Sequence, residues 1–129
     1  MFDRLSPYAP HALAVLRIVA ALLFIEHGTA KMLNFPATGG PGMAFNLFSL
    51  FGVAAVLEIV GGLLVLVGFF TRPVAFILAG EMAVAYWMVH YSMGGFFPLA
   101  NGGEAAILFC FVFLYLVFAG PGAWSVNKK

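Results

Sequence analysis

Charged residues are scarce in this chain: only 9% of its 129 residues are Asp, Glu, Lys or Arg, while 64% are hydrophobic. A soluble domain usually keeps about a quarter of its residues charged, because its surface must stay hydrated. The shortage of charge excludes a water-soluble globule, and the high hydrophobic content excludes an intrinsically disordered chain, so we expect most of the surface to face lipid. The formal net charge of +1 offers no long-range attraction for nucleic acid.

Cysteine is nearly absent as well, since Cys110 is the only one in the chain. A single cysteine excludes a disulfide-stapled secreted scaffold and redox chemistry of the Cys-x-x-Cys type. Because no basic residue stands beside it in the sequence, we expect Cys110 to pack as an apolar side chain in the last helix.

Long apolar runs are what the chain has instead, and clusters of Gly and Pro divide them at residues 35–42, 71–73 and 94–103. Four segments remain, at about residues 10–34, 45–70, 73–93 and 102–119. Each approaches the ~20 residues that cross a hydrocarbon core of ~30 Å. We therefore predict an all-α fold: one integral-membrane domain over residues 1–129, built as a bundle of four transmembrane helices.

Basic residues near the ends of these segments predict the orientation. Arg4, Arg72, Lys128 and Lys129 fall on one side of a four-span topology, whereas Lys31 lies near the other side. The positive-inside rule then places both termini in the cytoplasm. The expected location is an inner membrane, crossed several times, with the two loops rich in Gly and Pro facing the periplasm.

Each predicted helix carries a glutamate, and a charge at mid-membrane costs roughly 2.5 to 3.5 kcal/mol on insertion scales. At a rise of about 1.5 Å per residue, Arg17, Glu58 and Glu81 can share one layer toward the inner side. A guanidinium can hold two carboxylates, so we expect these three residues to meet. The layer is either a structural clamp or a proton relay in which one glutamate stays neutral.

A second polar layer is predicted near the outer end. Its members are His27, Lys31, Trp87, His90, Tyr91, Asn101 and Glu104. His27 and Lys31 line one helix face, which suits a quinone head group, because its carbonyls need donors and its reduction takes up protons. Trp87 and Tyr91 are also four residues apart and can stack on a planar ligand. The alternative is an interfacial histidine, a snorkelling lysine and a belt of aromatic residues.

Spacing suggests further assignments for the outer layer. Asn101 and Glu104 are three residues apart, close to a capping box at the start of the fourth helix. No spacing within one helix fixes two metal ligands, so no metal site is predicted. Glu26 points nearly opposite to Arg17 on a helical wheel and is assigned to neither layer.

Several motifs are specific when taken together. They are Leu16-Arg17-Ile18, Glu26-His27-Gly28-Thr29-Ala30-Lys31, Leu57-Glu58-Ile59-Val60-Gly61-Gly62, Gly68-Phe69-Phe70-Thr71-Arg72-Pro73 and Asn101-Gly102-Gly103-Glu104. In these motifs the chain resembles, over nearly its whole length, the DoxX family of small four-helix membrane proteins. The resemblance implies an inner-membrane protein. Related DoxD-type subunits are associated with thiosulfate oxidation coupled to quinone reduction, and other members look like membrane anchors for redox partners.

The leading hypothesis is a quinone-interacting membrane redox protein or oxidoreductase subunit with a polar pocket near the periplasmic end. No covalently bound cofactor is expected, and a quinone is the expected ligand. The expected partners are the lipid bilayer, a redox partner subunit and further copies of the chain, but no nucleic acid. Two alternatives stay open: a non-catalytic scaffold that anchors a redox partner, and a small-solute transporter or channel. The sequence does not decide whether the chain is an enzyme.

Overall fold

The computed structural model describes residues 2–33 and 48–127, with the backbone alone at Met93. Its elements are η1 (Phe2–Tyr8), α1 (Ala9–Leu33), α2 (Leu50–Val67), α3 (Thr71–Ala85), η2 (Tyr86–His90), α4 (Tyr91–Gly94), α5 (Pro98–Asn101) and α6 (Glu104–Ala119). η1 is a 3₁₀-helix and η2 a π-helical turn. Over the described residues the regular structure is entirely helical, as predicted.

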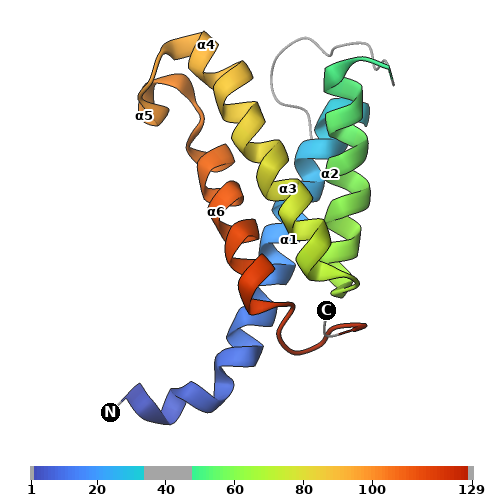
Figure 1. Ribbon diagram of the computed structural model, residues 1–129, viewed down its shortest axis with the longest axis vertical. Coiled ribbons are helices and arrows are strands. Elements are labelled where there is room, and N and C mark those ends of the chain that lie inside the picture. Colours follow the sequence, from blue (N-terminus) through green and yellow to red (C-terminus); the bar gives the residue numbers. More distant parts are fainter. Residues whose placement is uncertain (1, 34–47, 128–129) are drawn as a thin grey trace.

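Within the described residues, three helical stretches are long and apolar enough to cross a bilayer: Phe2–Leu33, Leu50–Val67 and Thr71–His90. The fourth, α6, is apolar but shorter, and its 16 residues span about 24 Å. This composition is consistent with a protein that crosses the membrane several times. Residues 2 and 127, the two ends of the described chain, lie toward the lower end in Figure 1, whereas α4 and α5 lie at the upper end.

The helix bounds refine the predicted segments. α1 ends at Leu33, and the third segment is one continuous helical run from Thr71 to Gly94. α6 begins at Glu104, two residues later than predicted, after the separate short helix α5. α2 begins at Leu50, where Ser49 Oγ accepts from Gly52 N at 2.9 Å, whereas the predicted start at residue 45 lies outside the described residues. Sequence periodicity missed this cap because apolar residues continue on both sides of it.

Two helix pairs make up the bundle (Figure 1). α1 packs along α2, α3 packs along α6, and α2 and α3 join the pairs. Glycine allows the first pair to approach closely: a Cβ at Gly62 would lie 2.5 Å from Ile25 Cγ1. Between the pairs, Phe24 and Phe113 are fully buried and meet edge to face with ring centroids 4.9 Å apart. Small residues thus set the spacing within the first pair, and aromatic rings fill the space between the pairs.

The segment after α6 folds back beneath the bundle. Ala123 N donates to Pro10 O at 3.0 Å, and Val126 N donates to Val67 O at 2.9 Å. Gly120 and Gly122 adopt positive φ angles of 80° and 77°, which reverse the chain direction there. The last described residues are therefore tied to the first turns of α1 and to the end of α2.

Arg17 is fully buried and binds this returning segment instead of a glutamate. Its guanidinium donates to Pro121 O, to Ala123 O at 3.0 Å and to Trp124 O at 2.9 Å. The prediction that Arg17 shares a layer with Glu58 and Glu81 is therefore wrong. Carbonyls in the irregular segment after α6 lack helical partners, so they are available to accept from a buried cation.

Candidate functional site

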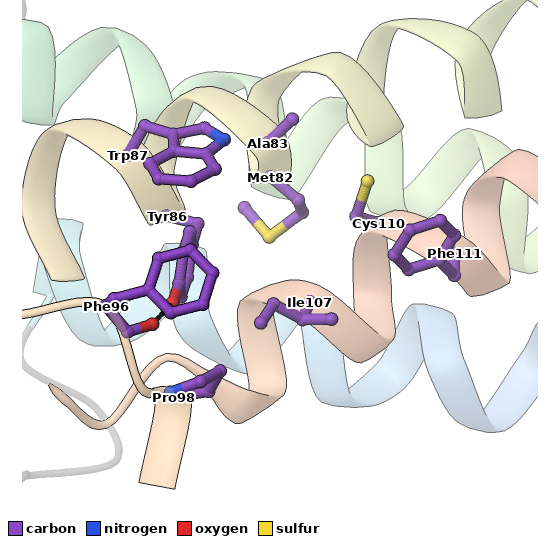
Figure 2. Close-up of a pocket in the computed structure, with 9 residues that line it drawn as sticks. All are labelled: Met82, Ala83, Tyr86, Trp87, Phe96, Pro98, Ile107, Cys110 and Phe111. Carbon is purple, nitrogen blue, oxygen red and sulfur yellow. Dashed lines mark hydrogen bonds between the residues drawn. The ribbon is translucent and has the colours of Figure 1, made fainter. Parts of the chain in front are cut away.

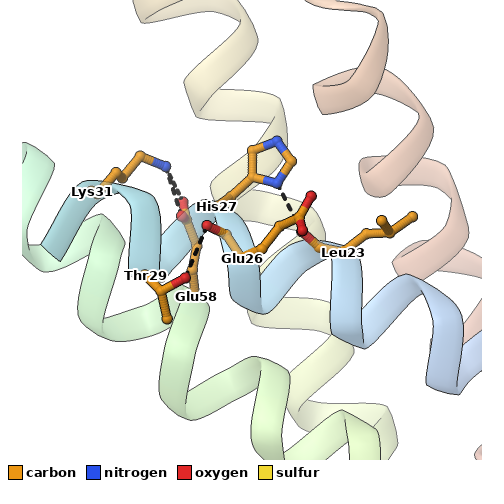
Figure 3. Close-up of polar contacts among 6 residues, drawn as sticks. All are labelled: Leu23, Glu26, His27, Thr29, Lys31 and Glu58. Atoms are coloured by element: carbon orange, nitrogen blue, oxygen red, sulfur yellow. Dashed lines mark hydrogen bonds and ion pairs between the residues drawn. The ribbon is translucent and has the colours of Figure 1, made fainter. Parts of the chain in front are cut away.

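A short ion pair joins α1 and α2 in the half of the bundle that carries α4 and α5. Lys31 Nζ lies 2.6 and 2.7 Å from the two carboxylate oxygens of Glu58 and donates to both (Figure 3). The Glu58 side chain is 1% exposed and the Lys31 side chain 23%. A carboxylate buried this deeply in a bundle surrounded by lipid needs a partner, so the ion pair removes much of the cost of burying Glu58.

Gly28 brings the two residues within reach. A Cβ at Gly28 would lie 3.0 Å from Glu58 Cβ and 2.7 Å from Ile59 Cγ1, so the helices could not approach this closely with a larger residue. The predicted start of the second helix near residue 45 placed Glu58 in the inner layer, too deep in the membrane to meet Lys31. With α2 starting at Leu50, Glu58 lies only about 12 Å below that start. Gly28 and Lys31 are three residues apart and share one helix face, and this spacing was the sequence signal that Lys31 lies where a second helix packs closely.

A cavity of about 130 Å³ lies beside the ion pair. Four of its lining residues can ionise: His27, Lys31, Glu58 and His90. The others are Phe24, Met82, Ala85, Gly102, Ala105, Ala106 and Phe109. The structure thus brings together three members of the predicted outer layer and adds Glu58, which had been assigned to the inner one. This volume can hold a few water molecules that bridge polar groups.

Both histidines of the cavity are anchored through the same ring nitrogen. His27 Nδ1 lies 2.9 Å from Leu23 O, and His90 Nδ1 lies 3.3 Å from Asn101 O. A carbonyl oxygen can only accept, so each Nδ1 carries the proton and donates it. Each neutral imidazole then has Nε2 as its free acceptor, which can take a proton from another group.

The π-helical turn η2 decides which way His90 faces. In a regular α-helix, Met82 and His90 would be about 80° apart around the axis; one extra residue in a π turn reduces this to about 20°. Tyr91 N donates to Tyr86 O, five residues earlier, as a π turn requires. Met82 and His90 accordingly line the same cavity. A regular helical wheel drawn from the sequence could not show this alignment.

Glu81 of α3 has buried carboxylate oxygens with no hydrogen-bond donor in residues 2–33 and 48–127. Its helix packs on α2 through Leu78, which a Cβ at Gly61 would approach to 2.8 Å, one turn below Glu81. Glu58, the other glutamate of the predicted inner layer, has Lys31 as its cation instead of Arg17. Glu26 lies exposed on α1 and outside this group.

An apolar pocket of about 300 Å³ lies on the other side of Met82, between the upper halves of α3 and α6 (Figure 2). Trp87 lines it, as do Tyr86, Phe96 and Ile107. Trp87 and Phe96 are both more than half exposed, so the pocket opens on the surface of the bundle. Trp87 thus belongs to a ring-sized apolar pocket and not to the polar cavity. Met82 lines both, and this flexible side chain is shared by the two spaces.

Asn101 organises the turn above these two spaces. Its amide nitrogen donates to Gly95 O at 2.7 Å and to the Tyr86 hydroxyl at 3.2 Å, and its amide oxygen accepts from Gly103 N at 2.8 Å. Tyr86 in turn donates to Phe96 O. Asn101 is therefore a positioning residue: it lies beside the cavity and holds the backbone around it.

Two further predicted members of the outer layer, Glu104 and Tyr91, do not line the cavity either. Glu104 is exposed at the start of α6, whose N-cap is Gly103 with no side-chain cap bond, so the predicted capping box of Asn101 and Glu104 is wrong. The reason is that Asn101 ends α5 and uses its side chain within the turn. Tyr91 is exposed and packs against Trp87 at a centroid distance of 5.5 Å.

Comparison with known proteins decides the family. The DoxX family model matches residues 12–91, which include the ion pair, Glu81 and His90. The chain belongs to the DoxX family. An uncharacterized protein of Haemophilus influenzae is 51% identical over 98% of this chain and 96% of its own length. The inner membrane proteins YqjF and YphA of Escherichia coli are 30% and 29% identical, over 88% and 93% of this chain and 88% and 91% of their own lengths. No solved structure matches the chain.

The relatives and the helices together give the location. Two DoxX relatives are named inner membrane proteins, and the part of the chain that the structure describes has three helices long and apolar enough to cross a bilayer. This DoxX protein is accordingly a multi-pass protein of the inner membrane, in contact with the lipid bilayer.

Proposed function

We propose that this chain is a quinone-interacting redox protein or oxidoreductase subunit of the inner membrane. One observation carries the proposal: a cavity lined by His27, Lys31, Glu58 and His90 is separated by Met82 from an apolar pocket open at the lipid-facing surface. The apolar pocket suits a planar ring against Trp87, and the cavity suits groups that exchange protons.

Quinone chemistry uses both spaces. Two electrons and two protons convert a quinone into a quinol, so a site must bind the ring and also supply protons. The chain's own residues contribute the ring pocket and the ionisable cavity. The electrons come from a reduced partner protein, which is the redox partner subunit expected from the sequence. The chain therefore acts as the membrane part of a two-component reaction.

Orientation follows from the same proposal. The bundle has Arg17 and Arg72 in the half that contains both described chain ends, and Lys31 in the other half. By the positive-inside rule, four spans then leave both termini in the cytoplasm and place the cavity toward the periplasmic end. Reduced partners would approach from that side.

Tryptophan fluorescence tests the ring pocket directly, because the chain has two tryptophans. Trp124→Phe leaves Trp87 in the pocket, and Trp87→Phe leaves Trp124, which lies near Arg17 at the other end. Each variant is titrated in nanodiscs with a decyl-substituted benzoquinone. We expect saturable quenching of Trp87 and a linear, collisional decrease for Trp124.

A filled pocket gives the control. Ala83 lines the apolar pocket, so Ala83→Leu in the Trp124→Phe background should remove saturation while leaving collisional quenching. Equal, non-saturable quenching of both tryptophans would overturn the proposal. That outcome would favour the non-catalytic scaffold, which needs no ligand in the bundle.

A further inference from the structure

The packing of α2 on α3 places Glu58 and Glu81 side by side. A Cβ at Gly61 of α2 would lie 2.8 Å from Leu78 Cδ2 of α3. Consecutive helices joined by a tight turn run antiparallel, so one turn up from Gly61 is Glu58 and one turn up from Leu78 is Glu81. Glu81 accordingly has Glu58 as the first of its charged neighbours, with Lys31 next.

Hydrogen bonding at this point is incomplete without a proton. Lys31 donates to both Glu58 oxygens, but no donor in the described part of the chain reaches either oxygen of Glu81. The nearest carboxyl group across the contact of Gly61 with Leu78 is that of Glu58, one turn above it on α2. Two carboxylates only accept, so a hydrogen bond between Glu58 and Glu81 would require a proton on one of them.

The charge balance of the site also requires a proton on one of the two carboxyl groups. The group contains one ammonium and two carboxyl groups, and the cavity residues contributed by α6 are Ala105, Ala106 and Phe109, none of which can ionise. The remaining ionisable residues at the cavity are two histidines, His27 of α1 and His90 of η2, and a histidine can be uncharged. With both carboxyls ionised, the bundle would bury a net negative charge, which a hydrocarbon environment strongly disfavours.

We propose that Glu58 and Glu81 share one proton beside Lys31, so that the three residues form a neutral proton store next to the cavity. The store deepens the proposed function, on which its use for quinone rests. When it releases its proton to Nε2 of His27 or His90, a carboxylate and an imidazolium result, and no electron moves. Water at the periplasmic end returns the proton. The cavity is thus the route between the store and the reacting ring.

Infrared spectroscopy of the purified protein in an ester-free detergent tests the store without any quinone. A protonated carboxyl group has a carbonyl stretch that shifts in heavy water and is absent from carboxylates. Near neutral pH we expect one such signal in the wild type and its loss in Glu81→Gln. Glu58→Gln should also abolish it, because Glu81 can then ionise against Lys31. Lys31→Met should raise it about two-fold, since both carboxyls must then be neutral.

Glu26→Gln is the matched control, because Glu26 lies on α1 but is exposed, and its signal should equal that of the wild type. Circular dichroism checks that each variant keeps its helices. Absence of the signal in the wild type, or its persistence in either Glu81→Gln or Glu58→Gln, overturns the shared proton. Because no quinone is added, a negative quenching experiment with Trp87 leaves this result untouched, and the reverse also holds.

Discussion

The two ends of the bundle accommodate their cations differently. Near the chain ends, Arg17 donates to carbonyls of the returning segment, and Arg72 donates to Phe118 O at the end of α6. At the other end, Lys31 donates to the side chain of Glu58 beside two histidines. Backbone carbonyls cannot take up or release a proton, whereas carboxylates and imidazoles can. A buried cation in a membrane protein therefore indicates chemistry only where its partners also titrate.

The largest expected effect comes from removing the arginine at the first end. Arg17→Leu leaves the carbonyls of Pro121, Ala123 and Trp124 without this donor, and each buried acceptor left unsatisfied costs about 1–3 kcal/mol. We expect a loss of about 3–5 kcal/mol and release of the C-terminal segment. Thermal unfolding in detergent and limited proteolysis after α6 measure the two effects.

Arg4→Leu is the control for that prediction, because Arg4 is exposed in η1 and should leave the melting temperature unchanged. Adding Glu58→Gln and Glu81→Gln to Arg17→Leu should recover nothing, since neither acid bonds to Arg17 in the described part of the chain. If the triple variant regained the stability lost in Arg17→Leu, Arg17 would interact with the two glutamates as the sequence predicted. The two ends of the bundle would then not differ in how they hold their cations.

Removing the lysine at the second end should cost less and should be repairable. Lys31→Met leaves Glu58 buried without its cation, and we expect a loss of about 2–3 kcal/mol, reduced because Lys31 is partly exposed. Lys31→Met combined with Glu58→Gln should regain most of the loss, because the neutral amide, unlike Glu58, does not have to take up a proton to stay buried without a cation. Thermal unfolding of the single and double variants, set out as a double-mutant cycle, measures the coupling. Equal melting temperatures for Lys31→Met and for the double variant would show that Lys31 and Glu58 are not coupled.

The smallest effect concerns the helix contact that supports the ion pair. Gly28→Ala places a Cβ 2.7 Å from Ile59 Cγ1, so α1 and α2 must separate, with a loss of about 1–2 kcal/mol. Gly80→Ala is the matched control, because a Cβ there meets nothing within 4 Å, and it should leave stability unchanged or raise it by about 0.5–1 kcal/mol. Paired thermal unfolding of the two variants distinguishes a steric effect from helix propensity. Similar changes in both would exclude the steric explanation.

Sequence alone predicted the helices well because their lengths and apolar content depend on the bilayer. The spacing of His27 and Lys31, with His90 at the end of the third run, also pointed to residues that do line one cavity. The partner of Arg17 could not be predicted, because an irregular segment after α6 carries no periodic signal. The direction in which the His90 side chain points depends on a π turn, which a regular helical wheel does not include. These misses are cases in which backbone geometry, and not side-chain pattern, decides the contact.

Arg17 also sets an order for assembly during synthesis. It enters the membrane with the first helix, yet Pro121 O, which it binds, lies 104 residues later in the chain. Until those residues leave the ribosome, the guanidinium must be solvated by water, lipid phosphate or the insertion machinery. The bundle therefore closes only after residues 121–124 have been synthesised and can accept from Arg17.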